Sequence, residues 1–406
     1  MNSVVLASKR SLLLSALCAV SFACSSSPTA TPTGSGGSAG AGTGGAASGT
    51  GGSGSGGATA GTGGGAGAAG SGGAGGGSGG VAGGSGGAAG GSGGVVSDGG
   101  PMDAPPAGDL APPGLTGTQD NPGTDGDGSF NQPAPYAKPP ETSSRAAGVP
   151  QGMVTPKALF ASTGTYPDRK FKYSIYVPAQ YQKGKRAALM VFTDARHYDE
   201  TDAYKFNVAI TFDNLIARGD IPVTIAVMID PGTPSGDYIS GGSDNPTYRS
   251  PQYDRSNGNY AKFLIDEFLT SVVLPNYDIV QDPDGWAIAG HSSGGSAAFA
   301  AAWNRTEKFH KVLTQNGSFN LIADAFPGQV NAMPAKPIRV YLNSGTGDMP
   351  GWMAANTGMA NAFMAKGYHY RYMHGTGTHD PPNAGIADFP DSLKWLWKGY
   401  RLPWYR

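Results

Sequence analysis

The sequence predicts an α/β fold with a mostly parallel central sheet, preceded by a long segment that forms no core. Strand-like and helix-like segments alternate along the second half of the 406-residue chain, as they do in sheets covered by helices. Residues 187–193 and 223–229 are nearly continuous apolar runs, as expected for strands covered on both faces. Most of the 67 glycines lie in one tract ahead of these segments, so whole-chain averages do not describe the folded part.

The remaining elements are predicted from local periodicity. Residues 171–177 alternate as a half-buried strand does, and residues 286–289 form a short apolar run. Residues 260–273 place apolar side chains about one helical turn apart, and residues 296–303 are rich in alanine, the best helix former. In total we expect strands at 171–177, 187–193, 223–229, 286–289, 338–342 and 368–373, and helices at 260–273, 296–303, 353–366 and 389–398.

The N-terminus has the pattern of an export signal, which we place at residues 1–23. Lys9 and Arg10 precede an apolar segment, residues 11–23, that is too short to span a bilayer. Cys24 directly follows small residues and resembles the lipidated cysteine of bacterial lipoproteins. We therefore expect an exported protein, anchored in the cell envelope (outer membrane or cell surface) through lipidation at Cys24. Cleavage by ordinary signal peptidase, giving a secreted protein, is the alternative.

Residues 24–146 are expected to be a disordered tether, and residues 147–406 a single domain. Residues 25–100 are glycine, serine, alanine and threonine with almost nothing large, so they cannot bury enough apolar surface to offset chain entropy. A flexible coil of ~75 residues holds its ends roughly 45–50 Å apart on average. Residues 101–142 are rich in proline and aspartate, which predicts a stiffer spacer.

Charge and cysteine content exclude several classes of function. The net charge is −1 and no basic stripe is present, so we expect no nucleic-acid partner, and contact with a membrane only through the N-terminal anchor. The two cysteines are Cys18 and Cys24, so the predicted domain has no disulfide, thiolate zinc site or cysteine nucleophile. No motif implies a metal or an organic cofactor, and the oligomeric state is left open.

One motif predicts a serine nucleophile. Gly290-His291-Ser292-Ser293-Gly294 matches Gly-x-Ser-x-Gly, in which the serine occupies a sharp strand-to-helix turn between close backbone segments. The pattern alone is weak, because residues 36–40 of the glycine tract match it too. Ser292 differs in its context, since it follows the apolar run 286–289 and opens the alanine-rich helix. We therefore predict the α/β-hydrolase fold, with Ser292 as nucleophile.

A serine hydroxyl needs a general base, which follows the serine and the acid in this fold. His379 lies in a glycine-rich loop after the last predicted strand, where it has the freedom to reach the serine. His374, at the end of that strand, is the alternative. His369 falls inside the strand, and His310 follows Ser292 too closely along the chain.

Asp348 is the predicted acid that orients the histidine. It follows the strand 338–342 through a short polar segment, and ligand-facing residues collect at the carboxyl ends of parallel strands. Asp324 is the alternative, and Asp380 is better suited to capping the loop of His379. For the oxyanion, we predict the backbone N–H of Ser293 together with that of Asp194 or Ala195, after the strand 187–193.

Residues 148–397 resemble the esterase family that includes the enterochelin (ferric enterobactin) esterases, which is related to the feruloyl and acetylxylan esterases. The resemblance assigns nucleophile, acid and base to Ser292, Asp348 and His379. Two departures stand out: the family commonly has Asp-Gly where this chain has Asp194-Ala195, and an acidic residue where it has Gln252. The matching stretches are 188–194, Arg249-Ser250, Tyr253-Asp254, 288–295, 337–342, 366–372 and 392–397.

The resemblance implies a serine esterase that acts through an acyl-enzyme intermediate. A small-molecule or polysaccharide-linked ester is the expected substrate, with siderophore and plant-polysaccharide esters as candidates. We expect residues 231–258 and Trp352 to border the pocket. The alternative for residues 231–258 is an ordinary surface loop. The alternative function is a non-catalytic cell-surface binding module that keeps the fold, and reaction with a fluorophosphonate probe distinguishes the two.

Overall fold

The computed structural model describes residues 116–198, 205–237, 247–322 and 326–405. Within them, a ten-stranded sheet has the strand order β2-β11-β10-β9-β8-β6-β7-β5-β3, with β4 paired to β5. The pairs from β2 to β7 are parallel, and β5 pairs antiparallel with β7, β3 and β4. The strands are β2 (Gly128–Asn131), β3 (Met153–Val154), β4 (Ala158–Ser162), β5 (Arg169–Val177), β6 (Ala188–Thr193), β7 (Thr224–Ile229), β8 (Trp286–His291), β9 (Lys311–Gln315), β10 (Arg339–Gly347) and β11 (Tyr370–Thr378).

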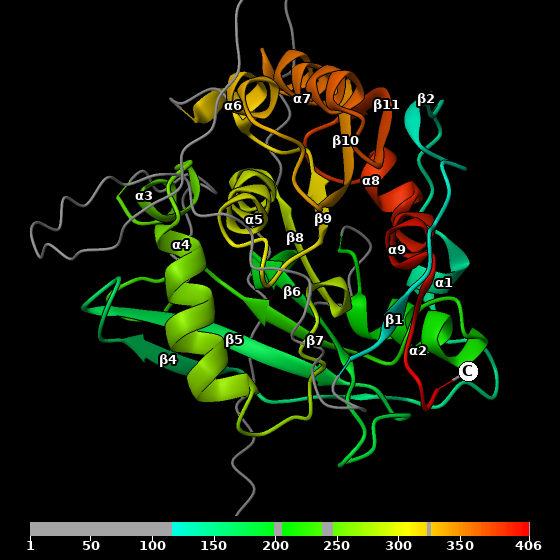
Figure 1. Ribbon diagram of the computed structural model, residues 1–406, viewed down its shortest axis with the longest axis vertical. Coiled ribbons are helices and arrows are strands. Elements are labelled where there is room, and N and C mark those ends of the chain that lie inside the picture. The colour runs from blue at the N-terminus through cyan, green and yellow to red at the C-terminus, as the bar shows by residue number, and fades with distance from the viewer. Residues whose placement is uncertain (1–115, 199–204, 238–246, 323–325, 406) are drawn as a thin grey trace, which may run out of the picture. The chain divides into compact units, whose positions relative to one another are not determined.

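Helices cover the sheet on both faces, which is why strands β6, β7 and β8 are buried along their whole length. One face carries α3 (Arg249–Tyr253), α4 (Asn259–Lys262), α5 (Ser293–Asn304), α6 (Phe326–Ala332) and α7 (Trp352–Lys366), and the wider helical segment Phe263–Val273 continues α4. The other carries α1 (Pro140–Ser143), α2 (Val208–Arg218), α8 (Ala384–Ala387) and α9 (Phe389–Trp397) (Figure 1). This arrangement confirms the predicted α/β-hydrolase fold.

The folded unit begins before the predicted boundary at residue 147. Strand β2 pairs with β11 and extends the sheet, while β1 (Thr118–Gln119) pairs with β12 (Tyr400–Arg401). Arg145 forms an ion pair with the buried Asp213 of α2 at 2.7 Å. Residues 116–146 are therefore part of the fold and not of a spacer, because they gain order from partners far along the chain. Residues 1–115 lie outside the described residues, so the signal, Cys24 and the rest of the tether stay predictions.

Two strands extend further than their apolar runs indicated. Strand β10 continues to Gly347 and β11 to Thr378, so the predicted loops ahead of Asp348 and His379 are largely strand. Backbone pairing of Gly345 with Gly375 holds these extensions together, and a Cβ at Gly345 would lie 2.1 Å from the carbonyl oxygen of Gly377. Close approach of two glycine-rich segments thus lengthens both strands. Strand β9, which lies between β8 and β10, was not among the predicted elements.

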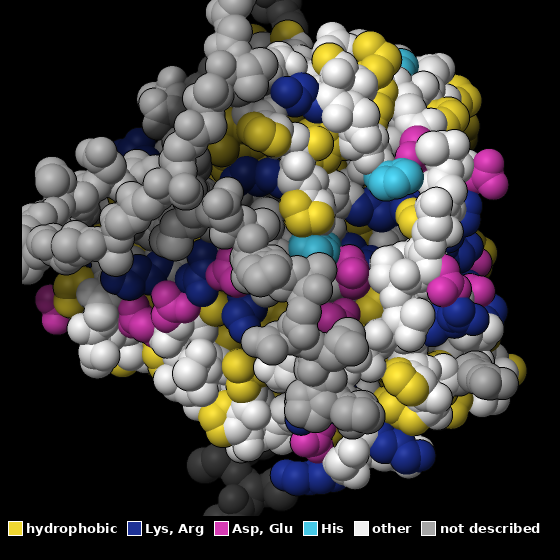
Figure 2. Space-filling view, in the orientation of Figure 1, with side chains coloured by type: hydrophobic (Ala, Val, Ile, Leu, Met, Phe, Trp, Pro, Cys, Tyr) yellow, Lys and Arg dark blue, Asp and Glu magenta, His cyan; other side chains and the backbone are white. Residues whose placement is uncertain are grey.

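The described surface carries both signs of charge. Figure 2 shows Lys and Arg side chains interspersed with Asp and Glu side chains on one face of the molecule. Among the described residues, no helix is both long and apolar enough to cross a membrane.

Candidate active site

Ser292 occupies a strained turn between β8 and α5. Its φ of 62° and ψ of −133° are rarely adopted by a residue with a side chain, and such backbone strain is typical of functional sites. Two glycines make the turn possible. A Cβ at Gly290 would lie 2.2 Å from the carbonyl oxygen of Gly294, and one at Gly294 would lie 2.5 Å from Oδ2 of Asp194.

The Ser292 hydroxyl is held at the floor of a cavity. The residue is 2% exposed, and its N–H donates to the carbonyl oxygen of Gln315 on β9 at 2.9 Å. Its Oγ has no hydrogen-bond partner among the described residues. The cavity has a volume of about 520 Å³ and is lined by Arg196, His197, Lys205, His291, Ser292, His379, Asp380 and Pro381.

His379 and Asp348, the predicted base and acid, are hydrogen-bonded to each other. Nδ1 of His379 lies 2.8 Å from Oδ1 of Asp348, and the Asp348 side chain is fully buried. Burial alone would raise the pKa of this carboxyl. Hydrogen bonds from His379, from Nδ2 of Asn316 (2.7 Å) and from the N–H of Met349 (2.7 Å) outweigh burial and hold the pKa below its ordinary value. Asp348 is therefore ionised at neutral pH and fixes one ring nitrogen of His379.

Two aromatic rings pack around the His379 ring. The ring of Trp352, the first residue of α7, meets it edge-on at a centroid distance of 4.4 Å. The ring of His291 lies 4.8 Å away on another side. Together with Asp348, these contacts restrict the orientation of the imidazole.

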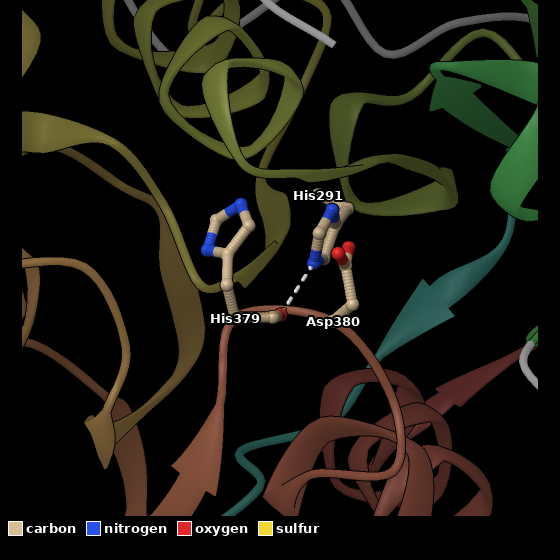
Figure 3. Close-up of side chains that lie close together, drawn as sticks. All are labelled: His291, His379 and Asp380. Carbon is tan, nitrogen blue, oxygen red and sulfur yellow. Dashed lines mark hydrogen bonds between the residues drawn. The ribbon is translucent and has the colours of Figure 1, made fainter. Parts of the chain in front are cut away.

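His291 holds the backbone of His379. Its Nε2 lies 3.0 Å from the carbonyl oxygen of His379, so Nε2 carries the proton (Figure 3). Burial, together with the neighbouring His379, lowers the pKa of His291 to about 3. His291 is therefore uncharged at neutral pH. His291, the residue between Gly290 and Ser292 in the motif, therefore supports the loop that carries His379.

A network of three buried asparagines was missed by the sequence analysis. Asn316, which follows β9, donates to Asp348 and accepts from Nδ2 of Asn343 on β10 at 2.7 Å. Nδ2 of Asn383 donates to the carbonyl oxygen of His379 at 3.0 Å and to Oδ1 of Asn316 at 3.3 Å. The network therefore links the loops of the acid and the base. Recognition of 311–315 as a strand would have placed Asn316 at the carboxyl edge of the sheet.

The residues whose N–H groups are the predicted oxyanion donors lie at the N-termini of two helices. Ser293 is the first residue of α5, and Ala195 is the first residue of the short helix Ala195–His197. The N–H groups at such positions have no acceptor within their own helix. Positive φ falls on Asp194 (57°) and not on Ala195, so alanine is tolerated where the family has glycine.

Arg249 holds Asp194, which precedes the predicted oxyanion donor Ala195, in place. Its guanidinium donates to both carboxylate oxygens of Asp194, at 3.0 and 2.6 Å, and to the carbonyl oxygen of His291 at 3.3 Å. All of these groups are buried. The side chain of Asp194 is therefore structural, and only its backbone N–H remains a candidate oxyanion donor.

The segment 231–258 does not line the active-site cavity in its described part. Gln252 accepts from the N–H of Gly232 at 2.9 Å and donates to the carbonyl oxygen of Gly232 at 2.8 Å, which ties the two ends of the segment together. Gln252 and Arg249 are both buried, and their side chains hold Gly232 and Asp194, respectively. Residues 238–246 lie outside the described residues.

The alternative bases and acids have other partners or other positions. His310 is bonded to Asp284 at 2.8 Å and His369 to Asp127 at 2.7 Å, both near the amino-terminal edge of the sheet. His374 lies within β11, opposite Ser344 of β10 and not at the strand's end. Asp324 lies outside the described residues.

Asp380 completes the only group of three potential metal-binding side chains in the described part of the chain. One ligand atom each from His291, His379 and Asp380 lie within 4.8 Å of one another (Figure 3). Nε2 of His291 and Nδ1 of His379 already have hydrogen-bond partners in the protein. That no metal is needed stays a prediction from the sequence.

Residues 164–389, more than half of the chain, match the family described as "Putative esterase". The chain therefore belongs to this esterase family.

Solved structures with the same fold include enterobactin and ferulic acid esterases. The enterobactin esterase of Shigella flexneri with 2,3-dihydroxy-N-benzoyl-glycine is 19% identical (TM-score 0.51), and the match covers 65% of this chain and 63% of that one. A ferulic acid esterase of Anaeromyces mucronatus in complex with ferulic acid is 16% identical (TM-score 0.50), with 65% and 98% covered. The chain thus spans less than two thirds of the enterobactin esterase. At these identities, the likeness concerns the fold.

Proposed function

We propose that the protein is an exported serine esterase that hydrolyses carboxylic esters through an acyl-enzyme intermediate. The observation that carries this proposal is the position of His379, which is bonded to the buried Asp348 and lines the same cavity as the strained Ser292. A base, its orienting acid and a serine on a strained turn between strand and helix are the parts that nucleophilic acyl transfer needs.

In the proposed reaction, Ser292 attacks the ester carbonyl while Nε2 of His379 takes the hydroxyl proton. Asp348 holds Nδ1–H and stabilises the imidazolium that forms. The N–H of Ser293, with that of Ala195 or Asp194, stabilises the oxyanion. His379 then gives the proton to the leaving alcohol, and the same base activates water to release the acid and regenerate Ser292.

For the substrate, we propose an ester with an aromatic acyl group, of a siderophore or a plant polysaccharide. The support is that the structures with the same fold bind a dihydroxybenzoyl compound and ferulic acid. The cavity of about 520 Å³ has room for a small acyl group, and Arg196 and Lys205 give its wall a cationic character. Hydrolysis assays on feruloyl, acetyl-xylan and catecholate esters test this choice, and a preference for acetyl-xylan would contradict it.

Substitution of the three proposed catalytic residues tests the mechanism. Ser292→Ala, His379→Ala and Asp348→Asn should each lower kcat on a small soluble ester by about 10³-fold or more, with the thermal unfolding midpoint little changed. His374→Ala is the matched histidine control and should retain near-native kcat. Loss of activity in His374→Ala with retention in His379→Ala would mean that the base is misassigned.

A further inference from the structure

Two buried cations lie opposite each other at the edge of the sheet away from Ser292. Lys311 begins β9 and Arg339 begins β10, and the two residues are register partners. They are 2% and 8% exposed, respectively. Like charges in directly opposed positions destabilise a sheet, so this arrangement requires a compensating negative charge.

Within the described residues, the protein supplies hydrogen-bond acceptors to Lys311 but not to Arg339. Nζ of Lys311 donates to Oε1 of Gln119 at 2.9 Å and to the carbonyl oxygen of Asp284. None of the three guanidinium nitrogens of Arg339 has a hydrogen-bond partner among the described residues. Oδ1 of Asp127 forms a long ion pair with Arg339 at 4.0 Å, beyond hydrogen-bond distance, and Oδ2 of Asp127 is hydrogen-bonded to His369.

The Arg339 guanidinium is nevertheless held in one place. Its central carbon lies 3.8 Å from the ring centroid of Trp395 on α9, a cation–π contact that fixes the group. Burial lowers the pKa of Arg339 to about 10, and Asp127 only partly opposes this effect. Arg339 is therefore a fixed, charged and under-satisfied donor group.

Arg339 also lines a cavity of about 320 Å³. Small-molecule sites begin at about 300 Å³, so the space suits a small organic ligand better than a bare ion. Pro337, Ile338 and Tyr368 form an apolar wall, and the half-buried Lys336 also lines the cavity. The Nζ of Lys336 donates one of its three N–H groups to the carbonyl oxygen of Trp303, whereas no donor of Arg339 has a hydrogen-bond partner among the described residues.

We propose that this cavity binds a small organic monocarboxylate, with the carboxylate on Arg339 and the apolar body against Pro337, Ile338 and Tyr368. A planar carboxylate matches the two parallel donors of a guanidinium, and a single under-satisfied cation calls for a single negative charge. The site lies at the amino ends of β9 and β10, whereas Asn316 and Asp348 follow their carboxyl ends. It is therefore distinct from the active site.

Thermal unfolding and calorimetric titration of the full chain with benzoate test the proposal. Saturating benzoate should raise the unfolding midpoint by about 2–4 °C, and Arg339→Gln should lower the affinity at least tenfold. Lys336→Glu places a negative charge at the cavity and should also weaken benzoate binding. This variant replaces Arg339→Gln as the test if Arg339→Gln does not fold. Lys394→Gln, at a half-buried lysine of α9 that does not line the cavity, is the matched control and should bind as the native chain does.

Three comparisons distinguish a carboxylate site at Arg339 from binding elsewhere on the protein or binding of any anion. Benzyl alcohol, which lacks the charge, should not change the unfolding midpoint. If inorganic phosphate raises the midpoint as much as benzoate does, the site does not select an organic carboxylate. Ser292→Ala should respond to benzoate as the native chain does, so the result does not depend on the proposed catalytic mechanism. Unchanged benzoate affinity in both Arg339→Gln and Lys336→Glu would refute the site.

Discussion

At the scale of single residues, the acid of the proposed triad depends on a neighbour that carries no charge. Asn316 donates to Oδ2 of Asp348, while His379 occupies Oδ1. Asn316 has a φ of 49°, a conformation that asparagine and aspartate tolerate better than most residues. The backbone at this position therefore suits asparagine, and Nδ2 of Asn343 holds the side-chain oxygen of Asn316.

Asn316→Asp should shift the acidic limb of the pH–rate profile to higher pH. The substitution keeps the shape and the tolerated backbone conformation but places a second carboxylate against Asp348, which raises the apparent pKa of the pair. We expect kcat at neutral pH to fall about tenfold or more, with KM little changed. The exposed Asn304→Ala is the control. An unchanged acidic limb in Asn316→Asp would show that Asn316 does not tune the acid.

The same hydrogen bonds make a contribution to stability that depends on pH. Because the pKa of Asp348 is lower in the folded protein than its ordinary value of about 3.9, the folded state favours the ionised form. The contribution is complete above that ordinary value and is lost as the pH falls through the lowered pKa. The site should therefore keep its acid ionised throughout the neutral range.

At the candidate site, residue identity predicted the contact between His379 and Asp348 but not the groups that support it. Ser292, Asp348 and His379 each lie where the chain order of this fold places its nucleophile, acid and base. Asn316, Asn343 and Asn383 have no such signature, because their function is defined only by the strands and loops that bring them together. Arg249 and Asp194 were both noted in the sequence, but their mutual ion pair became visible only in three dimensions.

At the scale of elements, residues 116–146 support the sheet and α2. Nδ2 of Asn214 donates to the carbonyl oxygens of Glu141 and Ser144, both at 2.8 Å, and the buried Asp213 accepts from Arg145. Removal of this segment would leave Asp213 and Asn214 without these partners and expose the edge of β11. Buried groups that lose their partners cost about 1–3 kcal/mol each.

Chains that begin at residues 116 and 147 should therefore differ in stability. The chain from residue 116 should unfold cooperatively, and the chain from residue 147 should have a midpoint lower by about 5 °C or more, or no cooperative transition. Arg145→Met in the longer chain should account for part of the loss. Equal midpoints for the two chains, measured by calorimetry, would mean that residues 116–146 are dispensable.

The sequence predicted the strands that have strong apolar runs, but not the strands that form only because neighbouring strands pair with them. The buried strands β6, β7 and β8 were predicted from their apolar runs. Strand β9 has only five residues with polar ones at both ends, and β2 has only Phe130 as a large apolar residue. Both exist because neighbouring strands supply their hydrogen bonds, which local sequence does not encode.

At the scale of the whole molecule, we propose that the N-terminal 115 residues anchor the esterase without taking part in its chemistry. Cys24→Ala, expressed in full length in a bacterium that processes lipoproteins, should lose fatty-acid labelling and move from the membrane fraction to the soluble fraction. Its kcat on a small soluble ester should equal that of the chain from residue 116. Retention of fatty-acid labelling in Cys24→Ala would exclude Cys24 as the anchor.

The most direct test of the account is labelling of the full chain with a fluorophosphonate, followed by peptide mapping. A triad with an activated serine should be labelled stoichiometrically, with all of the added mass on the peptide that contains Ser292 and with parallel loss of ester hydrolysis. His379→Ala should react much more slowly, because the hydroxyl then has no base. Label on another serine would contradict the assignment of Ser292. No label at all in a folded protein would contradict the serine mechanism and favour a binding module.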